Sequence, residues 1–377
     1  MAALVKMDIL LFSFHKHVYF FCFCVLSILK FLFFALEYCW GANLFGGGND
    51  SDYYHAYALG LDIVAVNIWP VLLRWLNDVG LYSRELVAVF LKFIVILVIP
   101  LLVARLAYVK DSPLYGKAFW MLACIVSAYP TLVYLATDIY RDVFMVFVWC
   151  VGLFVLRQMF EVRQVSLKFI CFILGLGFSW MLFEFRPYLG LGYLGALLFS
   201  GCYRFSKYPV WATMLIWPAG LFALYILGIL EPILSYRSMF HDGTLQGGSN
   251  IGIEFSSVYS FVPDFFRSLL YQITGFYFVN WLSVVAFVCE SILFLLALFY
   301  VLRNKRYADK FVNCLLVFFI VYASVWLLGN DNMGTATRLR VFNYISVYIA
   351  FFIIWQRKFK SDLVLSLGSA GKVQKTV

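Results

Sequence analysis

The sequence predicts an all-α, polytopic integral membrane protein with about ten transmembrane helices and two large loops on one side. Three observations predict this class. Of the 377 residues, 64% are hydrophobic and 13% are charged, and the mean hydropathy of +0.89 is too high for one soluble core. Apolar runs long enough to cross a bilayer recur along the chain, and basic residues gather in alternate connecting segments. The net charge of +9 is therefore explained by basic residues that orient the chain in the membrane. No nucleic-acid partner is expected.

Ten apolar runs justify the predicted helix count. A hydrocarbon core about 30 Å thick requires roughly 20 helical residues. Runs of about that length lie near 18–36, 85–104, 118–136, 142–156, 169–183, 188–202, 209–230, 281–301, 311–329 and 341–355. Runs four to six are short, so the predicted number of spans covers ten plus or minus one or two. We predict one transmembrane domain over 1–377, with external loops at 37–84 and 231–280.

The distribution of basic residues predicts the orientation. Lys6 and Lys16 precede the first run and no A-x-A-like cleavage site follows, so we expect a retained anchor helix with a cytoplasmic N-terminus. Ten spans then place both termini in the cytoplasm. This orientation puts 19 of the 29 Lys and Arg residues in cytoplasmic segments, 8 in external segments and 2 in spans. The opposite orientation would invert the usual bias.

All eight basic residues of the external segments are arginines: Arg74, Arg84, Arg141, Arg186, Arg237, Arg267, Arg338 and Arg340. Bidentate binding of phosphate or carboxylate favours the planar guanidinium over an ammonium. Four of the five helices that enter the membrane from this side begin with arginine, although the helix dipole disfavours a cation there by about 0.3 to 1 kcal/mol. We predict anion binding by Arg141, Arg186, Arg237, Arg338 and Arg340. Anchoring in lipid headgroups or pairing with acids is the alternative.

Arg338 and Arg340 open the last predicted span. Two residues apart, their side chains diverge by about 200° on a regular helix. Both reach one site only if 335–340 is partly unwound. Otherwise one arginine binds one substrate, and the other binds a second substrate or a carboxylate.

Three charges fall inside predicted spans: Lys30, Lys92 and Glu290. Each costs roughly 2.5 to 3.5 kcal/mol at the centre of a membrane helix. At 1.5 Å per residue, all three lie about 10 to 14 Å below the external ends of their helices. We therefore predict that Glu290 pairs with Lys30 or Lys92, as a structural ion pair or with a catalytic role.

The order of spans and loops resembles that of Wzy-type polymerases of bacterial O-antigen or capsule repeat units. The resemblance lies in Arg-Asp at 141–142, FRPY at 185–188, the loop carrying GGSNIGIEFSS, and GNDNMGTATRLR at 329–340. It implies a glycosyltransferase of the bacterial inner membrane that polymerises undecaprenyl-pyrophosphate-linked oligosaccharides on the periplasmic face, for lipopolysaccharide or capsule. It further implies membrane lipid and a chain-length regulator protein as partners. The arginines would stabilise the pyrophosphate leaving group.

The acceptor hydroxyl in such a transfer requires a general base, most often a carboxylate or His. Asp50, Asp52 and His55 are candidates in the first loop, with Asp52 or His55 preferred. Glu254 and His241 compete with them from the second loop. The sequence has no C-x-x-C or H-E-x-x-H pattern, so neither a metal nor a cofactor is expected.

Two other functions remain open. NDSDYYHAYA also resembles the acidic first loop of GT-C-type glycosyltransferases, which would imply an undecaprenyl-phosphate sugar donor and a single transfer. A flippase of lipid-linked oligosaccharides is the non-enzymatic alternative. It would favour charges along a central cavity and more spans.

Overall fold

The computed structural model is all-helical in the residues it describes, which are 2–40, 49–201, 204–205, 207–240, 249–255, 257–278 and 280–373. The first half contains α1 (Ala2–Trp40), α2 (Asn49–Ala58), α3 (Ile68–Asp78), α4 (Arg84–Phe93), α5 (Ile99–Leu106), α6 (Tyr115–Ser127), α7 (Pro130–Leu135), α8 (Arg141–Glu161) and α9 (Val165–Phe185). The second half contains α10 (Pro187–Phe199), α11 (Val210–Ile226), α12 (Glu231–Ser238), α13 (Phe261–Ser268), α14 (Trp281–Ala286), α15 (Ile292–Arg303), α16 (Lys310–Gly329) and α17 (Met333–Val373). Three π-helical turns, η1 (Ile94–Val98), η2 (Leu269–Ile273) and η3 (Phe287–Ser291), and the 3-10 turn η4 (Lys305–Tyr307) complete the described elements.

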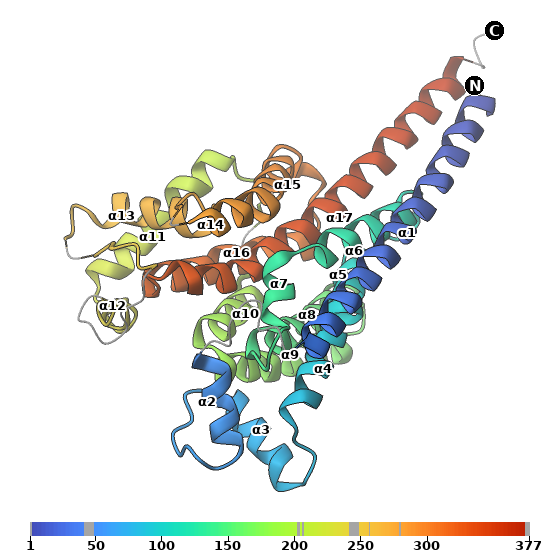
Figure 1. The fold of residues 1–377 in the computed structure, drawn as a ribbon. Coiled ribbons are helices and arrows are strands. Elements are labelled where there is room, and N and C mark those ends of the chain that lie inside the picture. The colour runs from blue at the N-terminus through green and yellow to red at the C-terminus, as the bar shows by residue number, and fades with distance from the viewer. Residues whose placement is uncertain are drawn as a thin grey trace.

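Within the described residues, seven helical segments are long and apolar enough to cross a membrane, or eight if α11 and α12, bent by 87° at their junction, count as one span. This is compatible with the predicted polytopic membrane protein. Each of the ten predicted runs contains helix, but α6 and α10 have only 13 residues each. Figure 1 shows α1 and α17 projecting from the end of the bundle opposite to α2 and α3. We call the end that carries α2 and α3 the loop side.

The predicted run near 118–136 is broken between α6 and α7. Pro130 has no N–H to donate, and it forces the residue before it out of the helical region. Tyr129 accordingly has an extended backbone with ψ of 108°. The break leaves the first N–H groups of α7 without helical partners, and one of them, that of Thr131, becomes a ligand for a buried carboxylate described below.

The last two long helices form the centre of the bundle. In the most apolar part of α17, 89% of the residues are buried inside the protein, and in α16 83%, whereas α1 and α9 each bury 17%. The α10 helix packs closely on α16 and α9. The peripheral helices α1 and α9 therefore offer most of their surface to lipid, and the central pair offers very little.

Glycines let α10 approach its neighbours closely, as small residues do between membrane helices. A Cβ atom at Gly190 would lie 2.5 Å from the backbone nitrogen and Cα of Phe183 on α9, and one at Gly192 would lie 2.6 Å from Cβ of Tyr322 on α16. The first contact involves backbone, which cannot rotate away. The spacing of α9 and α10 thus depends on the missing side chain at Gly190.

We expect Gly190→Ala to destabilise the protein by about 1 to 3 kcal/mol, the usual cost of overpacking. Gly220→Ala on α11 is the matched control, because nothing lies within 4 Å of its new Cβ and alanine favours helix over glycine by up to about 1 kcal/mol. Thermal unfolding of both variants in the same detergent measures the difference. Equal midpoints would contradict the close approach of α9 and α10.

Candidate functional site

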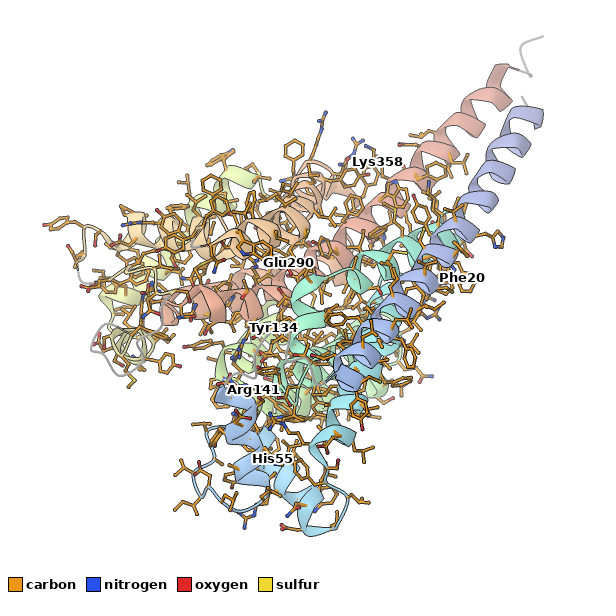
Figure 2. The ribbon with its side chains drawn as sticks, viewed as in Figure 1. Phe20, His55, Tyr134, Arg141, Glu290 and Lys358 are labelled. Atoms are coloured by element: carbon orange, nitrogen blue, oxygen red, sulfur yellow. The ribbon has the colours of Figure 1, made fainter. Side chains whose placement is uncertain are left out.

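The arginines predicted to bind anions fall into three structural settings. Figure 2 labels Arg141 near the top of α2, Tyr134 farther into the bundle, and Glu290 farther still, beside α17. Two arginines are buried against carboxylates, two lie between the starts of α8 and α10, and Arg338 is paired with an exposed acid. These settings decide which guanidinium groups an incoming anion can reach.

Arg237 on α12 lies in a buried polar knot at the turn between α16 and α17. Its guanidinium pairs with Asp331, and the two side chains are 2% and 0% exposed. It also donates to the carbonyls of Ile253 (2.7 Å) and Leu327 (2.8 Å). Asp331 in turn accepts from the backbone N–H groups of Gly252 (2.8 Å) and Ile253 (3.1 Å). Arg237 is thus paired with an acid, the alternative left open above, and its donors hold the segment 249–255 onto the turn.

Arg340 is also buried, and its Nη2 lies 3.2 Å from Oε2 of Glu290. Oε1 of Glu290 accepts from the backbone N–H (2.8 Å) and the hydroxyl (2.6 Å) of Thr131. The carboxylate thus joins η3, α17 and the start of α7. Arg340 is therefore also paired with an acid, and its side chain is only 2% exposed.

The predicted pairing of Glu290 with Lys30 or Lys92 is wrong. Lys30 donates to the carbonyl of Val95 at 3.2 Å, and Lys92 pairs with Glu37 at 3.2 Å. The prediction paired residues that lie at equal depth in the membrane, and this depth can be calculated from the sequence. Lys30 and Lys92 face the α1–α4–η1 side of the bundle, whereas α15 and η3 pack near α17, and only the tertiary structure decides that.

Arg338 has a different environment from Arg340, as expected for two residues on a regular helix. Its Nη1 lies 2.7 Å from Oδ2 of Asp50 on α2, and the side chains are 22% and 51% exposed. The guanidinium also stacks over the ring of Tyr140 at 5.4 Å. Since α17 is helical from Met333, the segment 335–340 is not unwound, and the two arginines serve two sites.

Arg141 and Arg186 flank the start of α8, close to Arg338. Arg141 donates to the carbonyl of Phe185 at 3.2 Å, and Arg186 lies 3.5 Å from Asp142. The charges of Arg141, Arg186 and Arg338 all act on the Asp142 carboxylate. Asp142 Oδ1 and Arg186 Nη1 are buried and have no hydrogen bond within the described part of the chain. The starts of α8 and α10 add positive dipole ends here, so the region favours an anion.

The predicted general bases lie on or near α2. Asp52 pairs with Arg84 at 2.9 Å, and Arg84 also donates to Asp138 at 3.0 Å. Burial raises the pKa of Asp138, but hydrogen bonds from Arg84 and from the Ile139 N–H outweigh it and leave the pKa below its usual value. Asp138 is therefore a fixed anion that helps to hold Arg84.

His55 Nδ1 lies 2.8 Å from the hydroxyl of Tyr82. Burial raises the pKa of Tyr82 to about 12, so this hydroxyl remains protonated at neutral pH and can donate to the imidazole. Glu254 is exposed in the segment 249–255, and His241 lies outside the described residues. Of the four described candidates, Asp50 is the one that contacts an arginine of the cavity described next.

A cavity of about 970 Å³ opens beside Arg338, between α1, α7, α14, η3 and the start of α17. Tyr134, Tyr277 and Trp281 supply aromatic surface, and Thr131, Thr337 and Ser283 supply hydroxyl groups. Among the described residues that line it, Arg338 is the one basic side chain and Glu290 the one acid. A cavity of this size with mostly apolar walls and a few polar groups is typical of a site for an organic ligand.

Sequence reasoning missed Thr131, Asp138 and the aromatic walls of the cavity. The proline of Tyr129-Pro130-Thr131 was a readable signal for the helix break that directs the Thr131 N–H at Glu290.

Comparison of the chain with protein-family models, with curated proteins and with solved structures found no match. The function is therefore argued from the site itself.

Proposed function

We propose that this protein transfers an oligosaccharide from a polyprenyl-pyrophosphate carrier to a second lipid-linked unit, and so polymerises repeat units for a bacterial surface polysaccharide. The observation that carries the proposal is the position of Arg338. It lines an amphipathic cavity of about 970 Å³ and is paired with a half-exposed carboxylate. A lipid-linked glycan needs such a combination, since it has an anionic group between an apolar chain and a polar sugar.

The cost of freeing each arginine identifies which ones can take the pyrophosphate. An exposed ion pair is worth about 0 to 1 kcal/mol, so phosphate oxygens can replace Asp50 on Arg338 at little cost. Breaking a buried pair costs about 3 to 5 kcal/mol, which rules out the same exchange at Arg237 and Arg340. Arg186 keeps its buried partner Asp142, so Arg141 and Arg186 act on the pyrophosphate through their charges at the starts of α8 and α10 and not by exchanging a partner.

The exchange also provides the base. When phosphate oxygens replace Asp50, its carboxylate is free to accept the proton of the acceptor hydroxyl. The hydroxyl oxygen then bonds to the anomeric carbon of the donor sugar, and the bond from that carbon to the pyrophosphate oxygen breaks. The leaving pyrophosphate keeps the electron pair, and the guanidinium of Arg338 stabilises its added charge. Asp50 takes this role here in place of the preferred Asp52 and His55, which are paired with Arg84 and Tyr82.

The GT-C-type transferase remains a second candidate, and the position of α2 favours it. Asp50 and Asp52 lie on a short helix in the first loop after α1, as the resemblance implied. A polyprenyl-phosphate sugar would bind the same arginine. The products differ: a polymerase gives a ladder that increases by whole repeat units, and a single transferase adds one sugar.

The test uses purified protein and a chemically defined lipid-linked repeat unit, with chain length read by gel and mass spectrometry. We expect a ladder with the wild type and at least a 100-fold lower rate with Arg338→Lys, because an ammonium lacks the bidentate fork. Folded yield should not change, because the Arg338–Asp50 pair is exposed. Asp50→Asn should bind inorganic pyrophosphate at least as tightly as the wild type and yet transfer no sugar.

Arg267→Lys is the matched control, because Arg267 is an exposed arginine on α13 and it should keep the full rate. Full-length polymer from Arg338→Lys would show that this residue only anchors its helix. The absence of any product with the wild type, on substrates with either phosphate or pyrophosphate, would refute both transferase functions.

A further inference from the structure

The first loop has an apolar surface that the proposed function does not use. Between residues 59 and 81, six large hydrophobic side chains are 62% to 88% exposed: Leu61, Ile63, Val64, Val66, Trp75 and Leu81. They lie on α3 and on the extended segments before and after it, on the loop side of the bundle (Figure 1). Soluble monomers seldom expose so many neighbouring apolar side chains, and such a patch marks an interaction surface.

The opposite face of α3 is already packed against the bundle. Trp69 and Leu73 are buried, and the Trp69 indole N–H donates to the carbonyl of Ile139 at 2.8 Å. Val71 and Trp75, one turn apart, point away from that contact and are exposed. The helix thus has two apolar faces, one fixed to the protein and one open.

Several backbone groups of the exposed segment have hydrogen-bond partners within the protein. The carboxylate of Asp62 accepts from the N–H groups of Ile63 (2.7 Å) and Val64 (3.2 Å). The hydroxyl of Tyr53 donates to the carbonyl of Val64 and accepts from the N–H of Val66 (3.1 Å). An extended segment in water has no need of these partners, whereas one in an apolar environment must have them.

We propose that residues 59–81 form an interfacial anchor that lies in the headgroup and upper acyl region of the bilayer on the loop side. The occupant we infer is lipid, because the patch is continuous along the chain with the outer face of α4. Leu81 and Val79 lead to Leu86 and Phe90, which are exposed on a helix long enough to span the membrane. This inference does not depend on the proposed function.

The anchor has a consequence for the arginines. The helix α2 packs on α3 and carries Asp50, the partner of Arg338. An anchor at the interface therefore places Asp50 and Arg338 near the level of lipid phosphates. The internal hydrogen bonds of Ile63, Val64 and Val66 lower the cost of placing this extended segment where little water is available.

The test is photo-crosslinking of the full chain in nanodiscs of phosphatidylethanolamine and phosphatidylglycerol. Benzoylphenylalanine is placed singly at Ile63 or Trp75, with Phe90 on α4 as the lipid-facing reference. Lys110, an exposed polar residue in the turn between α5 and α6, is the water-facing control outside the proposed anchor. We expect lipid adducts at Ile63 and Trp75 at a yield within about twofold of Phe90, and at least fivefold above Lys110.

Two outcomes would overturn the inference. Adduct yields at Ile63 and Trp75 as low as at Lys110 would show that the patch faces water. Covalent dimers in place of lipid adducts would show that a second copy of the chain covers it. Val66 is the substitute position for either variant that does not elute as a monodisperse protein.

Discussion

Arg237→Met is expected to destabilise the protein by about 3 to 5 kcal/mol, the cost of removing one partner of a buried ion pair. The substitution leaves the charge of Asp331 in a site where that side chain is fully buried. It also removes the donors of the Ile253 and Leu327 carbonyls. The segment 249–255 should then detach from the turn between α16 and α17, because Asp331 and Arg237 together hold it there.

Arg267→Met is the matched control for this substitution. Arg267 is exposed and lies over the ring of Tyr271 at 5.5 Å, so its loss should change the unfolding free energy by no more than about 0.5 kcal/mol. Thermal unfolding in detergent, followed by the monodisperse fraction after heating, compares the two. If Arg237→Met loses no more stability than the control, the buried knot does not stabilise the fold.

The second large effect is expected for the pair of Arg340 and Glu290. Glu290→Gln and Arg340→Gln should each cost about 3 to 5 kcal/mol, because each leaves one buried charge without its partner. The double substitution should recover most of that loss, since no net charge then remains between η3 and α17. The double-mutant cycle isolates this coupling from the separate contacts of each side chain.

Folded yield and unfolding midpoint in detergent provide the readout for the cycle. The control cycle is Lys92→Met with Glu37→Gln, a pair whose side chains are 15% and 11% exposed. It should show a smaller coupling, because the protein encloses these two charges less completely than Glu290 and Arg340. Additive losses for Glu290 and Arg340 would mean that the two side chains act independently.

The class of the protein could be predicted from the sequence, because the hydrophobicity of each helix depends only on its own residues and indicates whether the helix suits an apolar environment. The apolar runs predicted an all-helical protein with several long apolar helices, and the described part of the chain has seven or eight of them. Pro187 stands at the first position of α10, where proline is favoured, and Pro209 immediately precedes α11. The divergence of Arg338 and Arg340 also followed from helix geometry alone, since 3.6 residues per turn separate two positions by about 200°.

The partners of the charges were decided by tertiary structure. A sequence gives the depth of Glu290 in a helix but not which helix lies beside it, so a lysine at the same depth was chosen and an arginine on α17 is the partner. Likewise eight external arginines looked equivalent, and burial alone separates Arg237 and Arg340, whose carboxylate partners are fully buried, from Arg338, whose partner Asp50 is half exposed. Local sequence fixes what each helix is, whereas the exposure of a charge depends on neighbours distant along the chain.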